Sequence, residues 1–171
     1  MRALVWINED TWEVTVAEAA EFLPGDAEIT LLHVTSTEPE TVGRAARRGL
    51  LGRHPPPPAT SETWRDISEQ AATELLADAQ ARLGRQSTCR ALRGRIEREV
   101  VAATEGMDIL VLARDGDRER LGPRSLGPAT RFVIDHAPCR VLLIWPDTAP
   151  ELTTIPPPPP GAPPPHHPPH R

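Results

Sequence analysis

The sequence predicts an α/β fold: a five-stranded parallel sheet, doubly wound, with helices on both faces. Four apolar runs are nearly continuous rather than alternating, which is typical of strands buried on both faces of a parallel sheet. They occupy residues 3–7, 29–34, 109–113 and 141–145. A fifth, more polar run at 88–92 is expected to form an edge strand. Helical patterns separate these runs, and such alternation favours a parallel sheet.

Four helices are expected between the strands. The first spans 12–23, begins with an Asp10/Glu13 capping box and ends at Pro24. The second runs from about 62 to 83. Its inward face is expected to carry Trp64, Ile67, Ala71, Leu75 and Ala79. The third covers 95–105, and the fourth follows Gly127 and ends before Pro138.

Two segments differ in composition from this predicted domain, which covers residues 1–147. Residues 37–60 form a long insert rich in arginine and proline. Residues 148–171 are rich in proline and histidine, and we expect them to form a disordered tail. A proline-rich tail of this kind fits a partner with an aromatic-lined groove.

The charge balance excludes several classes of function. The chain has 171 residues, a net charge of -5 and no lysine, so all 19 basic residues are arginine. A Walker A loop and Schiff-base chemistry both need a lysine, and a net acidic chain makes nucleic acid an unexpected partner. Two isolated cysteines and no apolar run long enough to span a membrane predict a cytoplasmic protein without a metal site.

The segment 113–130 holds the strongest candidate site. It leaves a buried strand, crosses a glycine-containing loop and enters a helix, and its arginines are Arg114, Arg118, Arg120 and Arg124. Backbone N–H groups of such a loop and arginine side chains both bind phosphate. The alternative is a solvated turn in which Asp115, Asp117 and Glu119 neutralise the arginines. A divalent-cation site at 115–117 is a weaker alternative.

Several motifs in order resemble the universal stress protein family. His136-Ala137-Pro138-Cys139 precedes the last apolar run, as in that family, and the 113–130 loop follows its G-x2-G-x9-G-(S/T) pattern in outline. The resemblance covers residues 2–146, apart from the 37–60 insert. It implies the same α/β fold and, in the nucleotide-binding branch, a loop that wraps the ribose and phosphates of ATP.

Residue by residue, this sequence departs from the pattern that the resemblance implies. The first glycine falls on Ala113, ten residues instead of nine separate Gly116 from Gly127, and Pro128 replaces the Ser/Thr. The aspartate expected after the first strand is Asn8. The candidate nucleotide-binding residues are therefore Ile7, Asn8, Val34, Ala113, Arg114, Gly116, Arg124, Gly127, Pro128 and Ala129.

Two functions follow from the resemblance. The first is a cytoplasmic regulatory, stress-response protein that binds ATP, AMP or another adenine nucleotide, with magnesium. The alternative is the same fold without nucleotide, acting as a homodimeric interaction module that pairs through Val141, Leu143 and Trp145 of the last strand. An enzyme is not expected, because no residues supply both a base and a metal site; weak ATP hydrolysis stays open.

Overall fold

The structure is a computed structural model that describes residues 1–37, 59–155 and 157. Its five strands are β1 (Arg2–Trp6), β2 (Glu28–Ser36), β3 (Thr88–Gly94), β4 (Ile109–Ala113) and β5 (Arg140–Ile144). They form one parallel sheet in the order β3-β2-β1-β4-β5. The predicted fold class is confirmed, and the polar run is an edge strand as expected.

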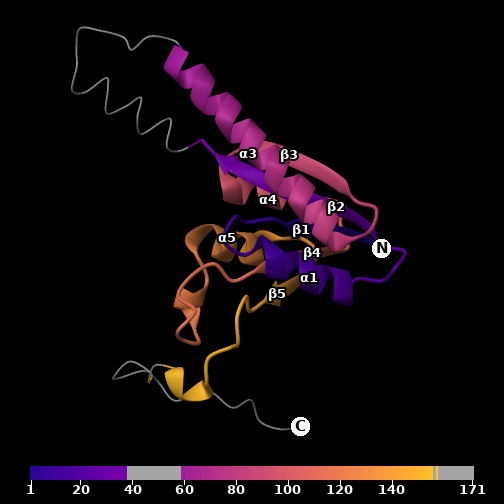
Figure 1. Ribbon diagram of the computed structural model, residues 1–171. Helices are drawn as coiled ribbons and strands as arrows, with labels where there is room; N and C mark the ends of the chain where they lie inside the picture. Colours follow the sequence, from indigo (N-terminus) through magenta and orange to yellow (C-terminus); the bar gives the residue numbers. More distant parts are fainter. Residues whose placement is uncertain (38–58, 156, 158–171) are drawn as a thin grey trace, which may run out of the picture.

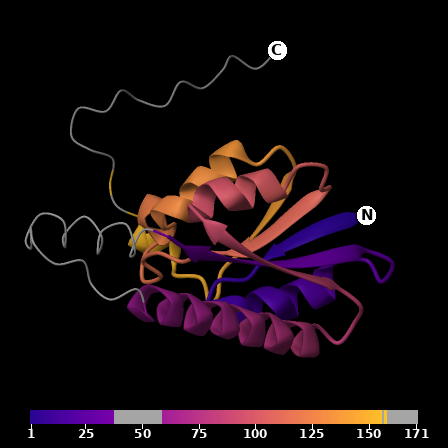
Figure 2. The same cartoon turned by 90° about the horizontal axis from the view of Figure 1, so that it is seen from above.

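Helices cover both faces of this sheet (Figures 1 and 2). They are α1 (Trp12–Phe22), α3 (Ala59–Leu83), α4 (Ile96–Ala103) and α5 (Pro128–His136). Figure 2 shows α1 and α3 on one face and α4 and α5 on the other. Alternate residues of each central strand fill the two resulting layers. In β1, for example, Ala3 and Val5 face α1 and α3, while Leu4 and Trp6 face α4 and α5.

The inward face of α3 differs from the predicted one. Its fully packed residues are Ala72, Leu76, Ala79 and Leu83. Of the predicted face, Ala79 is buried and Leu75 is partly buried, but Ala71 is exposed and Ile67 is 54% exposed. Figure 1 shows that the first part of α3 extends beyond the strands. The side chain of Trp64 lies outside the described part.

The capping box predicted for α1 is wrong. The N-cap of α1 is Thr11, which makes no side-chain cap hydrogen bond. The Thr11 N–H instead donates to the carbonyl of Asn8 (3.0 Å), closing a turn before the helix. The turn closed by Asn8 therefore precedes α1 in place of the predicted capping box.

The first part of the predicted tail is described by the structure. Residues 148–155 of this predicted tail are described and contain a 3-10 helix, η2 (Leu152–Thr154). The remaining tail, 156 and 158–171, and most of the predicted 37–60 insert lie outside the described residues. No helix in the described ranges is long and apolar enough to cross a membrane.

Candidate functional site

The carboxyl ends of β1 and β4 lie side by side at the centre of the sheet. From β1 the chain continues into α1 on one face, and from β4 it continues into α5 on the other face. Such a switch point is where open α/β sheets bind ligands. The connections after these strands, residues 7–11 and 114–127, therefore form the candidate site.

The longer connection folds back on itself. The Gly116 N–H donates to the Ser125 carbonyl (3.1 Å) and the Asp117 N–H to the Arg124 carbonyl (2.8 Å). A Cβ on Gly116 would lie 2.3 Å from the Arg124 carbonyl oxygen, so this close approach requires glycine. Two of the candidate nucleotide-binding residues, Gly116 and Arg124, are thus in close backbone contact. The Arg124 side chain is exposed.

Asp115 occupies the N-terminus of α5. Its carboxylate accepts the Gly127 N–H at Oδ1 (2.7 Å) and the hydroxyl of buried Thr130 at Oδ2 (2.8 Å). A helix N-terminus attracts an anion because its first N–H groups and the helix dipole point outward. Here the chain supplies that anion itself. The predicted cation site at 115–117 does not agree with this role, because Asp115 faces hydrogen-bond donors.

Arg114 turns inward rather than toward a ligand. Its Nη1 donates to the hydroxyl of Ser125, and its guanidinium lies 4.5 Å from the ring centre of Trp145. Its Nε is buried without a hydrogen-bond partner among the described residues. Burial lowers the pKa of Arg114, although a guanidinium remains charged at neutral pH. Arg114 therefore joins the ends of β4 and β5.

The shorter connection is closed by local contacts. The Asn8 carbonyl accepts the Thr11 N–H, and its Oδ1 accepts the Asp10 N–H at 3.4 Å. The carbonyl of Ile7 is bonded to Nδ1 of buried His33 (2.9 Å). His33 is thus a structural residue. The Ile7 carbonyl and the Asn8 Oδ1, both expected to contact a nucleoside, each have a partner within the protein.

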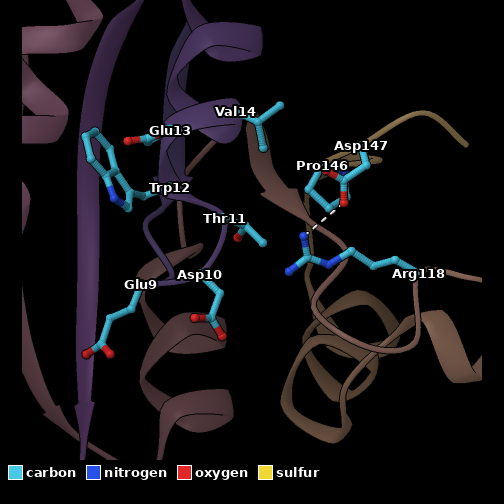
Figure 3. A pocket seen from close by; sticks show the side chains of 9 residues that line it. All are labelled: Glu9, Asp10, Thr11, Trp12, Glu13, Val14, Arg118, Pro146 and Asp147. Atoms are coloured by element: carbon cyan, nitrogen blue, oxygen red, sulfur yellow. Dashed lines mark hydrogen bonds and ion pairs between the residues drawn. The ribbon is translucent and has the colours of Figure 1, made fainter.

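An open depression of about 310 Å³ lies between the two connections (Figure 3). One wall is the start of α1, residues 9–14, and the other is formed by Arg118, Pro146 and Asp147. Arg118 is paired with Asp147, with 3.0 Å between Nη1 and Oδ2. The other lining carboxylates belong to Glu9, Asp10 and Glu13, so the depression is mainly acidic.

The other candidate nucleotide-binding residues lie in the hydrophobic core or at the start of α5. Val34 and Ala113 are 4% and 6% exposed, and each belongs to a hydrophobic cluster. Ala129 packs against the cluster beneath α5, while Pro128 is the first residue of that helix and is exposed. The structure therefore brings Arg114, Gly116 and Gly127 together but leaves Val34 and Ala129 outside the loop.

Of the predicted dimer residues, Val141 and Leu143 lie on β5, at one edge of the described sheet, whereas Trp145 follows the end of this strand at Ile144. The Arg140 N–H and the Ile144 carbonyl are bonded toward β4. Because alternate residues of a strand direct their backbone groups to opposite edges, Val141 and Leu143 direct theirs outward. Their side chains pack partly against the α4/α5 cluster.

Residues outside the predicted set complete the loop. Thr130 and Ser125 are both 0% exposed and anchor Asp115 and Arg114. The contact between Arg114 and Trp145 could have been predicted from the pairing of β4 with β5. Ala113 is paired with Ile144, and Arg114 and Trp145 are the residues that follow them. The hydrogen bonds of Asp115 could not be predicted from strand pairing, because they depend on how the loop returns to α5.

Comparison with known proteins identifies the family. The model of the universal stress protein family matches residues 1–144. The chain belongs to this family. A search of curated proteins finds no match. The loop described above, 114–127, lies within the matched range.

Solved structures agree with this assignment. The hypothetical protein MJ0577 is 22% identical, with a TM-score of 0.52, and the match covers 84% of this chain and 94% of that one. A universal stress protein in complex with cAMP is 12% identical, with a TM-score of 0.56 and coverage of 86% and 98%. One from Archaeoglobus fulgidus is 15% identical, with a TM-score of 0.54 and coverage of 84% and 97%. At these identities the likeness shows the fold, and the family supports a role in the stress response.

Proposed function

We propose that this universal stress protein is a non-catalytic, cytoplasmic stress-response protein that acts through protein contacts, with its own Asp115 where a nucleotide phosphate would bind. The observation that supports this is the pair of bonds from Gly127 and Thr130 to the Asp115 carboxylate. An anion at a helix N-terminus contributes about 0.3–1 kcal/mol, and up to about 2 kcal/mol when partly buried. A phosphate must displace this internal anion before it can bind.

The surrounding charges also oppose a polyphosphate. Three acidic residues of the β1–α1 side, Glu9, Asp10 and Glu13, line the depression. Of the arginines expected to bind phosphate, Arg118 is paired with Asp147 and Arg114 is turned toward Ser125 and Trp145. Binding ATP would bring like charges together and break existing contacts, which favours the function without nucleotide.

The outer edge of β5 supports contact with a second copy. Val141 and Leu143 direct backbone groups away from β4, and an unpaired strand edge is a ready template for another strand. Trp145 fits this interface less well than predicted, because its ring already stacks on Arg114. We therefore propose a homodimer that pairs through Val141 and Leu143. A partner of the proline-rich tail stays a prediction.

A single-phosphate adenine nucleotide is the second candidate. It is favoured by the exposed Arg120 and Arg124 on the loop and by the related universal stress protein in complex with cAMP. Such a ligand carries less charge than ATP, so it meets less repulsion. Its phosphate still has to displace the Asp115 carboxylate from the N-terminus of α5.

Calorimetric titration and thermal unfolding with Mg-ATP, AMP and cAMP test the main proposal. We compare the unchanged protein with Asp115→Ala, which vacates the N-terminus of α5, and with Asp117→Ala, a control in the same loop. A ligand at 100 times its Kd adds about 2.7 kcal/mol of stability. We expect this gain only in Asp115→Ala. Saturable binding of ATP to the unchanged protein would contradict the proposal, and binding of AMP or cAMP alone would favour the second candidate.

Light scattering tests the proposed dimer. Leu143→Pro removes an outward N–H without removing the bonds that Arg140 and Ile144 make to β4. We expect a dimer mass for the unchanged protein and a monomer mass for Leu143→Pro, with circular dichroism confirming that the variant is folded. Cys89→Ser, a change on the opposite edge strand β3, serves as the control. Equal masses for the unchanged protein and Leu143→Pro would exclude this interface.

A further inference from the structure

The segment that follows β5, residues 145–155, contacts the candidate loop at three separate points. We call this segment the C-terminal strap. The Trp145 ring lies against Arg114, Asp147 pairs with Arg118 at 3.0 Å, and the Thr154 hydroxyl accepts the Leu121 N–H at 3.1 Å. Figure 3 shows the second contact, with Arg118 reaching across to Asp147 beside Pro146.

These contacts occur in the same order along both segments. Loop residues 114, 118 and 121 meet strap residues 145, 147 and 154. The strap therefore follows the whole outgoing half of the loop rather than touching it once. All three strap residues lie beyond residue 144, where the match to the family model ends.

We propose that the C-terminal strap is a latch that keeps the 114–127 loop closed over Asp115. The outgoing half of the loop carries Gly116 and Asp117, which pair with Ser125 and Arg124 on the returning half. A strap that holds Arg118 and Leu121 also holds this hairpin-like fold, and with it the position of Asp115 at α5. This proposal rests on the proposed function in one respect, since the loop it closes is the one expected to exclude nucleotide.

The latch is built to open reversibly. The side chains of Arg118 and Asp147 are 36% and 66% exposed, and an exposed ion pair is weak and screened by salt. At the other end of the strap, Thr154 is held by a local hydrogen bond as well. Its hydroxyl donates to the Glu151 carbonyl (2.7 Å) while it accepts from the Leu121 N–H. Asp147 and Thr154 are therefore positioning residues that act through the loop.

Amide hydrogen exchange on the full chain tests the latch without any ligand. The variant Asp147→Ala/Thr154→Val removes both polar contacts while keeping the size of Thr154. We expect exchange of amides 116–122 to rise about tenfold, as for a segment that opens locally, with no change in β1 or β4. The control Thr153→Val removes a hydroxyl whose hydrogen bond stays within the strap, to Glu151, and should leave the loop unchanged.

A charge swap makes the result specific. Arg118→Asp alone should raise loop exchange, and adding Asp147→Arg should restore protection, because the pair is rebuilt with reversed charges. Protection that is equal, within about twofold, in the unchanged protein and in Asp147→Ala/Thr154→Val would overturn the latch. That outcome leaves the role of Asp115 standing, whereas ATP binding to the unchanged protein would remove the proposed function and leave the latch intact.

Discussion

The two connections at the centre of the sheet close their turns in different ways. The turn of residues 8–11, between β1 and α1, is closed by Asn8, whose carbonyl and side chain bond Thr11 and Asp10, while Ile7 before it bonds the distant His33. Residues 114–127, between β4 and α5, depend on groups far away in the sequence. Arg114 contacts Trp145 and Arg118 pairs with Asp147.

The difference shows how length changes what a loop needs. A short turn can be closed by the backbone and side chain of one residue that bonds its own neighbours. A longer loop loses more conformational entropy when it closes, so it needs contacts from other elements. The longer connection therefore has more positions at which a single change alters its shape.

The largest effect is expected at the crossing point of the longer loop. Gly116→Ala places a methyl group 2.3 Å from the Arg124 carbonyl oxygen, so backbone must move. We expect the free energy of unfolding, measured in urea, to fall by about 1–3 kcal/mol. Gly25→Ala is the matched control, because its new Cβ meets nothing within 4 Å. Equal stability of the two variants would show that the loop is not closed at Gly116.

A smaller loss is expected where the loop joins the neighbouring strand. Arg114→Ala removes the bond to Ser125 and the stacking on Trp145. We expect about 1–2 kcal/mol from these two contacts. Arg120→Ala, an exposed change in the same loop, should stay within about 0.5 kcal/mol of the unchanged protein. If urea unfolding gives the two variants the same midpoint, Arg114 does not join β4 to β5.

The smallest effect is expected in the short connection. Asn8→Ala removes the long 3.4 Å bond to the Asp10 N–H but keeps the backbone bond to Thr11. We expect a loss of about 0.5 kcal/mol or less, near the lower limit for a hydrogen bond. Thermal unfolding measures this loss against Glu9→Ala, a neighbouring exposed change. A loss as large as that of Arg114→Ala would remove the contrast between the two connections.

Much of the fold could be predicted from the sequence because the relevant signals are local. Continuous apolar runs marked the strands, and glycine or proline marked the ends of the helices. The face of α3 was predicted wrongly at Ile67 and Ala71, because the buried face follows Ala72 and Leu76, one residue further along the chain than the predicted Ala71 and Leu75. The predicted capping box is also absent, because the turn before α1 is closed by Asn8 and the helix begins after Thr11.

For the candidate site, the sequence located the loop but not its partners. The departures at Ala113 and Pro128 already indicated a weakened phosphate loop. Asp115 was weighed only as a neutralising charge or a cation ligand. Its bonds to Gly127 and Thr130 arise when the loop returns to the start of α5, which no spacing rule along the chain describes.

By itself, then, the sequence determined the α/β class, the order of the elements and the family, because apolar periodicity and local motifs carry that information. Only the tertiary structure decided what fills the N-terminus of α5 and what holds the loop above it. Asp115 reaches Thr130, and Arg118 and Leu121 reach Asp147 and Thr154, across separations that depend on the packed sheet. Such contacts form only after the strands have brought distant segments to one edge.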